Sequence, residues 1–198
     1  EKVIKNGVPF ESVIKNITRG AQIKATILDE IVSDEPTNMQ YLMLANIKDG
    51  IISDDLPYLK EMDPKYEKYC IKNGSLVISK NASPVKMAIV SVQEGNKILA
   101  NGNLYVIELD KDKINPYFLK AYLESESGKA ALSRVAVGAT LLNLPVEGLK
   151  KVIIPLPDLE SQKKIADQYY AKLSEIKELK YKLEKATEEL EHIYTEEK

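Results

Sequence analysis

Residues 138–166 read GATLLNLPVEGLKKVIIPLPDLESQKKIA. The order indicates a loop, then a short apolar strand that ends in Pro155-Leu156-Pro157, then the start of a long helix. Asp158 is well suited to cap this helix, and Glu160 in its first turn interacts favourably with the helix dipole. The pattern therefore predicts that one helix runs from this point to the C-terminus.

The expected helix carries an apolar stripe at alternating steps of three and four residues, made of Ile176, Leu179, Leu183, Ala186, Leu190 and Ile193. This spacing is that of the a and d positions of a coiled coil, so the stripe is predicted to form a dimer seam. About 38 residues at 1.5 Å each make a rod of roughly 57 Å, which is too long to fold back on a small body. We therefore expect a globular domain over residues 1–157 and a helical rod over residues 158–198.

Upstream of the rod, strand and helix patterns alternate without the regular period of βαβ units, which indicates the α+β class. The apolar spacing over residues 10–17, after Pro9, predicts a short helix. Lys48-Asp49-Gly50 indicates a hairpin turn, and Asn115-Pro116 indicates a capped helix start. The remaining expected elements are strands over residues 75–79, 87–92 and 104–109, and helices over residues 115–123 and 127–135.

Several classes of protein are disfavoured by composition. No run approaches 18 uninterrupted apolar residues, so no membrane span is expected, and no signal peptide opens the chain. Cys70 is the only cysteine, which excludes an internal disulfide and fits the reducing cytoplasm. With His192 as the only histidine, a zinc site would need carboxylates for most of its ligands, and no metal site is expected. The chain starts at Glu1 without methionine, so we expect that it is a fragment or a half-length form of a longer protein.

The charge balance limits how the chain could bind nucleic acid. It has 28 Lys and Arg residues against 30 Asp and Glu residues, whereas nonspecific duplex binders are usually strongly basic. Residues 72–100 are locally basic, with Lys72, Lys80, Lys86 and Lys97 against Glu94 alone. Any surface that contacts DNA is therefore expected to be local.

Three partial matches to catalytic motifs do not survive inspection. Asn115-Pro116-Tyr117-Phe118 lacks the second proline of the Asn-Pro-Pro-Tyr loop of adenine methylases, and helix capping explains both its Asn and its Pro. Asp158 and Glu175-Ile176-Lys177 imitate a metal-dependent nuclease motif, but 17 residues on one helix separate the acids by roughly 25 Å. No phosphate-binding loop is present. The chain is predicted to be non-catalytic, with no cofactor of its own.

The residue types that read base edges and phosphates gather in a few loops. The segment between two expected strands supplies Lys80, Asn81, Ser83 and Lys86 without an acid. Further candidates for DNA contact are Asn101, Asn103, Thr140 and Arg19. A solvated hairpin loop explains residues 80–86 equally well, so both interpretations stay open.

The order of these motifs resembles that of the specificity (S) subunit of type I restriction–modification systems. The family's Gly-Thr loop corresponds to Gly138-Ala139-Thr140, its proline-rich strand to Ile154-Pro155-Leu156-Pro157, and its helix start to residues 159–166. The upstream segments 10–20, 76–90 and 115–123 follow in family order. The family's Ser-Arg-Gly-type loop is replaced by Ser79-Lys80-Asn81, which puts any transferred contact in doubt. Gln162 in the helix start is assigned a structural role, reaching back to the backbone at the strand end.

The resemblance implies that one target recognition domain reads one half of a bipartite site in double-stranded DNA, and that the helix acts as spacer and dimer seam. It also implies that two such units lie with their helices antiparallel, as a homodimer or within a longer chain. Methyltransferase subunits that carry S-adenosylmethionine would dock on this scaffold, and a fused methyltransferase is a further possibility. The alternative is a coiled-coil interaction module that binds no nucleic acid, which the near-neutral charge favours.

Overall fold

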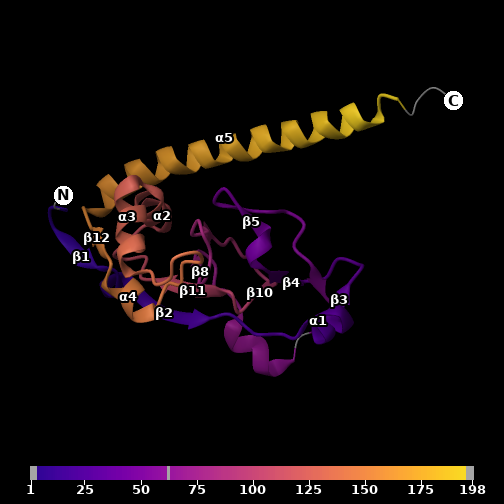
Figure 1. The fold of residues 1–198 in the computed structure, drawn as a ribbon, viewed down its shortest axis with the longest axis horizontal. Coiled ribbons are helices and arrows are strands. Elements are labelled where there is room, and N and C mark those ends of the chain that lie inside the picture. Colours follow the sequence, from indigo (N-terminus) through magenta and orange to yellow (C-terminus); the bar gives the residue numbers. More distant parts are fainter. Residues whose placement is uncertain (1–3, 62, 195–198) are drawn as a thin grey trace.

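Two four-stranded sheets form the body of the molecule, described for residues 4–61 and 63–194 in a computed structural model (Figure 1). The first sheet is antiparallel throughout, in the order β2 (Ile14–Arg19), β11 (Leu104–Leu109), β8 (Leu76–Ser79) and β9 (Met87–Ile89). The second has the order β10 (Lys97–Ala100), β4 (Met39–Leu42), β7 (Tyr58–Leu59) and β3 (Val32–Ser33), with β10 and β4 parallel. Two short pairs complete the strands: β1 (Gly7–Pro9) with β12 (Ile153–Pro155), and β5 (Ile47–Lys48) with β6 (Ile51–Ile52).

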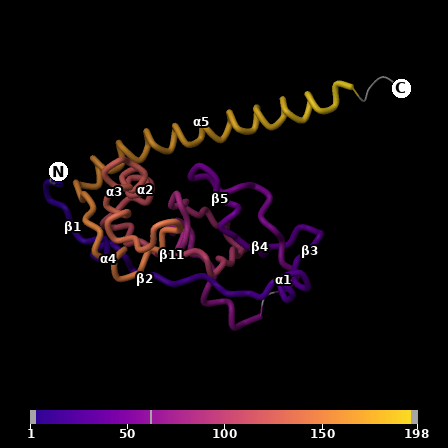
Figure 2. Tube along the Cα trace, in the orientation of Figure 1, coloured from indigo at the N-terminus to yellow at the C-terminus, as the bar shows by residue number. Residues whose placement is uncertain are grey.

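Five α-helices and three 3-10 turns occur in the described part of the chain. Four of the helices are short: α1 (Ala25–Ile31), α2 (Pro116–Glu124), α3 (Glu126–Val135) and α4 (Val146–Lys151). The fifth, α5 (Leu159–His192), runs along one side of the body and extends beyond it (Figures 1 and 2). The 3-10 turns are η1 (Phe10–Val13), η2 (Leu44–Asn46) and η3 (Pro64–Tyr69). This mixture confirms the predicted α+β class with a long C-terminal helix.

The central strands are apolar on both faces because both faces are covered. Leu76 and Ile78 of β8 belong to a core shared with α2, α3 and α4. Val77 of the same strand and Val106 of β11 belong to a second core, together with Leu42 of β4 and Ala100 of β10 from the second sheet. Successive side chains of a strand point to opposite faces, so the first sheet lies between the helices and the second sheet.

The predicted helix over residues 10–17 is wrong. Only Phe10–Val13 forms a helical turn, a 3-10 turn, and the chain then continues as β2, which pairs with β11. Phe10 and Val13 are both buried, so the apolar spacing is real but is satisfied within a single turn. The β-branched residues that follow suit a strand better than a helix.

Other local predictions are confirmed. The hairpin turn at Asp49-Gly50 has φ angles of 51° and 74°, the left-handed values that its tight connection requires. The Asn115 side chain accepts from the backbone N–H groups of Tyr117 and Phe118, so it is the predicted cap of α2. The Asp158 carboxylate accepts from the Ser161 N–H at 2.9 Å, so it caps α5 as predicted.

Gln162 joins α5 to the body, which confirms its structural assignment. Its side chain is fully buried, and its Oε1 accepts from the Asn115 N–H at 2.8 Å. Its Nε2 donates to the carbonyl oxygens of Pro157 at 2.8 Å and of Lys113 at 3.0 Å. The amide therefore bonds to the backbone before β12 leads into α5 and to the backbone before α2, and so fixes the first turn of the rod against the body.

Candidate nucleic-acid interface

The ends of all four strands of the first sheet meet at one edge. Arg19 at the end of β2 lies opposite Tyr105, and Leu104 at the start of β11 lies opposite Ser79 at the end of β8. Met87 at the start of β9 lies opposite Ile78. The loops that leave this edge are therefore neighbours in space although they are distant in sequence.

Backbone hydrogen bonds join these loops into one surface. The Lys80 N–H donates to the Asn103 carbonyl oxygen at 2.9 Å, and the Leu144 N–H donates to the Lys80 carbonyl oxygen at 2.9 Å. The Ala82 N–H donates to the Leu142 carbonyl oxygen at 3.1 Å. We call the surface made by residues 19–22, 80–86, 101–103 and 138–144 the loop edge. It brings together every residue that the sequence analysis singled out for DNA contact.

Five of the predicted contact residues keep their side chains unengaged. Within the described residues, no side-chain hydrogen bond or ion pair involves Lys80, Asn81, Ser83, Asn103 or Thr140. Ser83, Asn103 and Thr140 are exposed, whereas Lys80 and Asn81 are half-buried. Their polar atoms are available to a ligand without loss of an internal bond.

Asn101 and Lys86 are instead engaged within the protein. Asn101 Nδ2 donates to the Tyr41 hydroxyl at 2.6 Å, and its Oδ1 accepts from the Asn103 N–H at 2.8 Å. Burial raises the pKa of the Tyr41 hydroxyl, and the Asn101 hydrogen bond opposes that rise. Lys86 Nζ donates to the Leu44 carbonyl oxygen at 3.4 Å. Both side chains hold the loops in place, and binding DNA through them would require breaking these bonds.

Arg19 is exposed but held in one orientation. Its Nε donates to the Gly102 carbonyl oxygen at 2.7 Å. The Gln22 side chain, with its amide oxygen turned toward the guanidinium, accepts from both terminal nitrogens at 2.5 and 2.7 Å. Sequence reasoning missed Gln22. The signal that points to this close packing is Gly20, where a Cβ would lie 2.0 Å from the Asn101 carbonyl oxygen.

The segment that contains Thr140 is closed into a loop by its own backbone. The Val137 N–H donates to the Asn143 carbonyl oxygen at 2.8 Å, and the Asn143 N–H donates to the Val137 carbonyl oxygen at 2.9 Å. Gly138, with a φ of 114°, makes the turn that this closure needs. Thr140 is presented near the tip of the closed loop, exposed to solvent.

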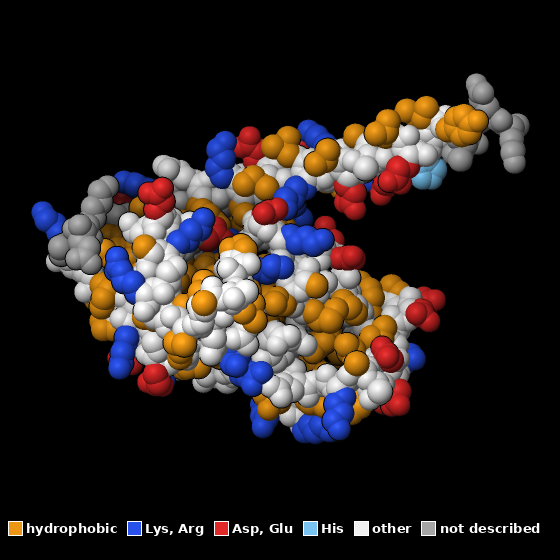
Figure 3. Space-filling model, in the orientation of Figure 1, with side chains coloured by type: hydrophobic (Ala, Val, Ile, Leu, Met, Phe, Trp, Pro, Cys, Tyr) orange, Lys and Arg blue, Asp and Glu red, His pale blue; other side chains and the backbone are white. Residues whose placement is uncertain are grey.

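The predicted dimer seam lies on a face of α5 that does not touch the body. Its large residues are between 41% exposed, at Ile176, and 72% exposed, at Ile193, and Ala186 is exposed as well. The face toward the body is made by Gln162, Ala166, Tyr169 and Leu173, which are buried or half-buried. At 3.6 residues per turn the seam is rotated roughly 100° about the helix axis from that face. Hydrophobic side chains are visible along the outer half of the rod in Figure 3.

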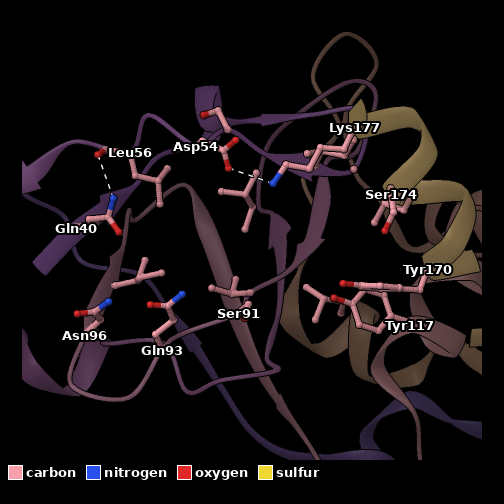
Figure 4. Close-up of a pocket in the computed structure, with 18 of the residues that line it drawn as sticks. Gln40, Asp54, Leu56, Ser91, Gln93, Asn96, Tyr117, Tyr170, Ser174 and Lys177 are labelled. Carbon is pink, nitrogen blue, oxygen red and sulfur yellow. Dashed lines mark hydrogen bonds and ion pairs between the residues drawn. The ribbon is translucent and has the colours of Figure 1, made fainter. Parts of the chain in front are cut away.

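A groove of about 540 Å³ lies between the body and α5, away from the loop edge (Figure 4). On the α5 side the Tyr170 ring meets that of Tyr117 edge to face, with centroids 5.0 Å apart. Lys177 Nζ lies 3.1 Å from the Asp54 carboxylate across the groove. None of the predicted DNA-contact residues lines it.

The described residues contain no group of three or more His, Cys, Asp or Glu side chains arranged to hold a metal ion. Asp158 and Glu175, which imitate a nuclease motif in sequence, both lie on α5, where one caps the helix and the other pairs with Lys172 at 2.7 Å. No described helix is both long enough and apolar enough to cross a membrane.

Comparison with known proteins places this architecture. Residues 22–189 match the family model of the type I restriction modification DNA specificity domain. The chain belongs to this family. A match across residues 22–189 includes most of the body and nearly all of the rod, so the family covers the loop edge apart from Arg19, Gly20 and Ala21. The family provides sequence specificity, so the chain is a DNA-specificity module and not an enzyme. No curated protein matches it.

Solved structures share the specificity-domain fold at low sequence identity. A chain from a type I R-M system, described for complex assembly and conformational transition, is 18% identical with a TM-score of 0.62, over 95% of this chain and 43% of that chain. The HsdS subunit from Thermoanaerobacter tengcongensis is 18% identical with a TM-score of 0.57, over 88% of this chain and 39% of that chain. The S subunit from M. genitalium is 14% identical with a TM-score of 0.54, over 82% and 37%. The chain thus spans about two-fifths of the length of these structures.

Proposed function

We propose that residues 1–157 form a target recognition domain that reads one half-site of a bipartite DNA target, and that residues 158–198 form its spacer and dimerisation helix. The observation that carries this proposal is the convergence of the loop edge. Four segments far apart in sequence supply Lys, Arg, Asn, Ser and Thr side chains to one surface, and acids are absent from all four segments. These are the side chains that contact phosphates and base edges.

Within the loop edge, the unengaged side chains are proposed to make the contacts. Lys80 would pair with a phosphate, and Asn81, Ser83, Asn103 and Thr140 would approach base edges or sugar–phosphate oxygens. Arg19, Asn101 and Lys86 are proposed to act from fixed positions at the margin of the same surface. A local basic surface suits a chain with 28 basic and 30 acidic residues, because larger partners would share the phosphate contacts.

The rod is proposed to join two recognition domains through its seam. In a homodimer, or beside the equivalent helix of a longer chain, an antiparallel partner would cover the exposed leucines and isoleucines of α5. The relatives' chains are more than twice as long as the parts that match, which supports a second recognition unit. Because the seam and the body-facing stripe lie on different sides of α5, both contacts can form together.

The proposed partners are double-stranded DNA and methyltransferase subunits. S-adenosylmethionine would be held by the methyltransferase, and this chain is proposed to hold no cofactor. Such an assembly would act in the cytoplasm, where bacterial DNA is accessible. A coiled-coil interaction module without nucleic acid is not favoured, because the family match extends over the body as well as the rod.

A titration of the assembled complex with duplex DNA tests the proposal. Lys80→Ala should weaken binding and reduce the slope of log affinity against log salt by about one unit, the effect of one lost phosphate contact. Lys129→Ala on α3, also an exposed lysine, is the matched control and should leave the slope unchanged. An unchanged slope for Lys80→Ala, or no sequence-dependent binding by the native complex, would show that the loop edge does not contact DNA.

A further inference from the structure

Three elements meet at a buried polar junction beneath the rod. Lys120 of α2 is fully buried, and its Nζ donates to Glu124 Oε1 at 2.8 Å and to the Tyr169 hydroxyl of α5 at 2.5 Å. The Tyr169 hydroxyl donates in turn to Glu124 Oε2. The ammonium group also lies 5.0 Å from the centroid of the Tyr169 ring. A charged group in this position is tolerated because each partner satisfies another.

The tip of the β5–β6 hairpin closes this junction. Gly50 has a φ of 74°, and a Cβ at this position would lie 2.5 Å from Lys120 Nζ and 2.8 Å from Glu124 Oε1. Only a residue without a side chain can therefore sit directly over the junction. The hairpin is thus seated against α2 at the place where α2 holds α5.

The same hairpin reaches α5 at a second place. The Asp49 carboxylate forms an ion pair with Lys180, and Asp54, just after β6, pairs with Lys177 at 3.1 Å. Tyr169 and Lys180 are separated by about 16 Å along the helix. Beyond Lys180 every described residue of the rod is exposed, and Figures 1 and 2 show this part extending free of the body.

We propose that the β5–β6 hairpin is a strut that fixes the direction in which the rod leaves the body, with Asp49, Gly50 and Asp54 as its positioning residues. It thereby sets the separation of the two half-sites, a consequence that rests on the proposed function. A helix held only at its first turns pivots about them, whereas a helix held at two separated places has a defined direction.

The length of the rod makes small changes of direction important. Glu189 lies 20 residues beyond Tyr169, or roughly 30 Å, so a rotation of about 10° at Tyr169 would displace it by about 5 Å. Base pairs are stacked about 3.4 Å apart, so this displacement exceeds the length of one base pair. Exposed ion pairs contribute little to folding stability. The strut is therefore expected to affect direction and to leave the melting temperature unchanged.

The direction of the rod is measurable by electron spin–spin distances in the full chain. Spin labels are placed at Glu35→Cys and Glu189→Cys in a Cys70→Ser background, and labelled chains are diluted with unlabelled chains so that only distances within one chain are seen. Asp49→Asn/Asp54→Asn should move the mean distance by several ångströms and broaden its distribution. Lys177→Gln/Lys180→Gln removes the same pairs from the rod side and should have the same effect.

The matched control is Glu175→Gln/Glu178→Gln, which removes two acids whose ion pairs lie within the rod. It should leave the distance distribution at its native width. A native distribution in the Asp49→Asn/Asp54→Asn variant, or equal broadening in the control, would overturn the strut.

The consequence for DNA is tested by methylation of a duplex library in which only the gap between half-sites varies. The assembled complex with Asp49→Asn/Asp54→Asn should accept a wider range of gaps, with unchanged half-site sequences. A shifted rod with an unchanged gap preference would overturn the link to half-site separation. Failure of the native complex to methylate any member of the library would count against the proposed function, whereas the distance measurement on the chain alone would still judge the strut.

Discussion

At the scale of residues, two asparagines of one loop have different tasks although both were predicted to contact DNA. Asn101 uses both side-chain atoms internally, bonding to the Tyr41 hydroxyl and to the Asn103 N–H. Asn103 is exposed with an unengaged amide. Sequence alone could not distinguish them, because the partner of Asn101 lies 60 residues away on β4.

Replacing each asparagine by alanine should separate these tasks. Asn101→Ala leaves the fully buried Tyr41 hydroxyl without its partner and should lower the free energy of unfolding by about 1–2 kcal/mol. Asn103→Ala should leave stability unchanged and alter the preferred base at one position of the half-site. Urea unfolding and selection from randomised half-sites measure the two effects. A destabilised Asn103→Ala with unaltered base preference would assign this residue a structural role as well.

The buried junction supports a second prediction at this scale. Glu124→Gln leaves the Lys120 ammonium buried without its counter-charge and should lower the free energy of unfolding by about 2 kcal/mol. Lys120→Met replaces the buried charge by an apolar chain of similar length and should cost less. Urea unfolding of both variants is the measurement, and a greater loss for Lys120→Met would show that the charge itself stabilises the junction.

At the scale of elements, predictions succeeded where a local signal determines the structure. The Asp49-Gly50 turn, the Asn115 cap and the Asp158 cap each depend on neighbouring residues. The segment at residues 10–17 failed because pairing of β2 with β11, nearly a hundred residues away, overrides its helical spacing. The parallel pairing of β10 with β4 was missed for the same reason.

The candidate site divides along the same line. Residue types in loops 80–86, 101–103 and 138–144 were sufficient to nominate DNA contacts, but their meeting at one edge depends on the order of the strands. The role of Gln22 depends on an approach between Gly20 and Asn101 that no local pattern indicates.

The exposed seam of α5 gives the prediction that belongs to this scale. Leu183→Asp/Leu190→Asp would place two charges in the centre of a helix pair, where desolvation and lost packing cost several kcal/mol. Sedimentation of this variant should show a monomer with an intact body. Tyr181→Asp/Thr187→Asp adds the same charge outside the seam and should remain associated. A wild-type chain that is monomeric at micromolar concentrations would contradict the homodimer.

At the scale of the whole molecule, reading and spacing are assigned to separate parts. The loop edge lies at one end of the first sheet, whereas the rod is anchored by Gln162, Tyr169 and the β5–β6 hairpin. Changes in the length of the rod beyond Lys180 therefore leave the loop edge untouched. This separation allows the spacer to be altered without altering the half-site.

Inserting one heptad after Leu183 preserves the seam and lengthens an antiparallel pair by roughly 10 Å. At about 3.4 Å per base pair, the gap between half-sites should grow by about three base pairs. Deleting one heptad should shorten the gap similarly, and methylation mapping of both variants measures the change. The half-site sequences should stay the same, because the loop edge is unchanged. Three base pairs also turn one half-site around the duplex axis, so we expect lower activity even at the best new gap. A gap that stays constant in both variants would show that α5 only clamps the dimer and that another element sets the separation.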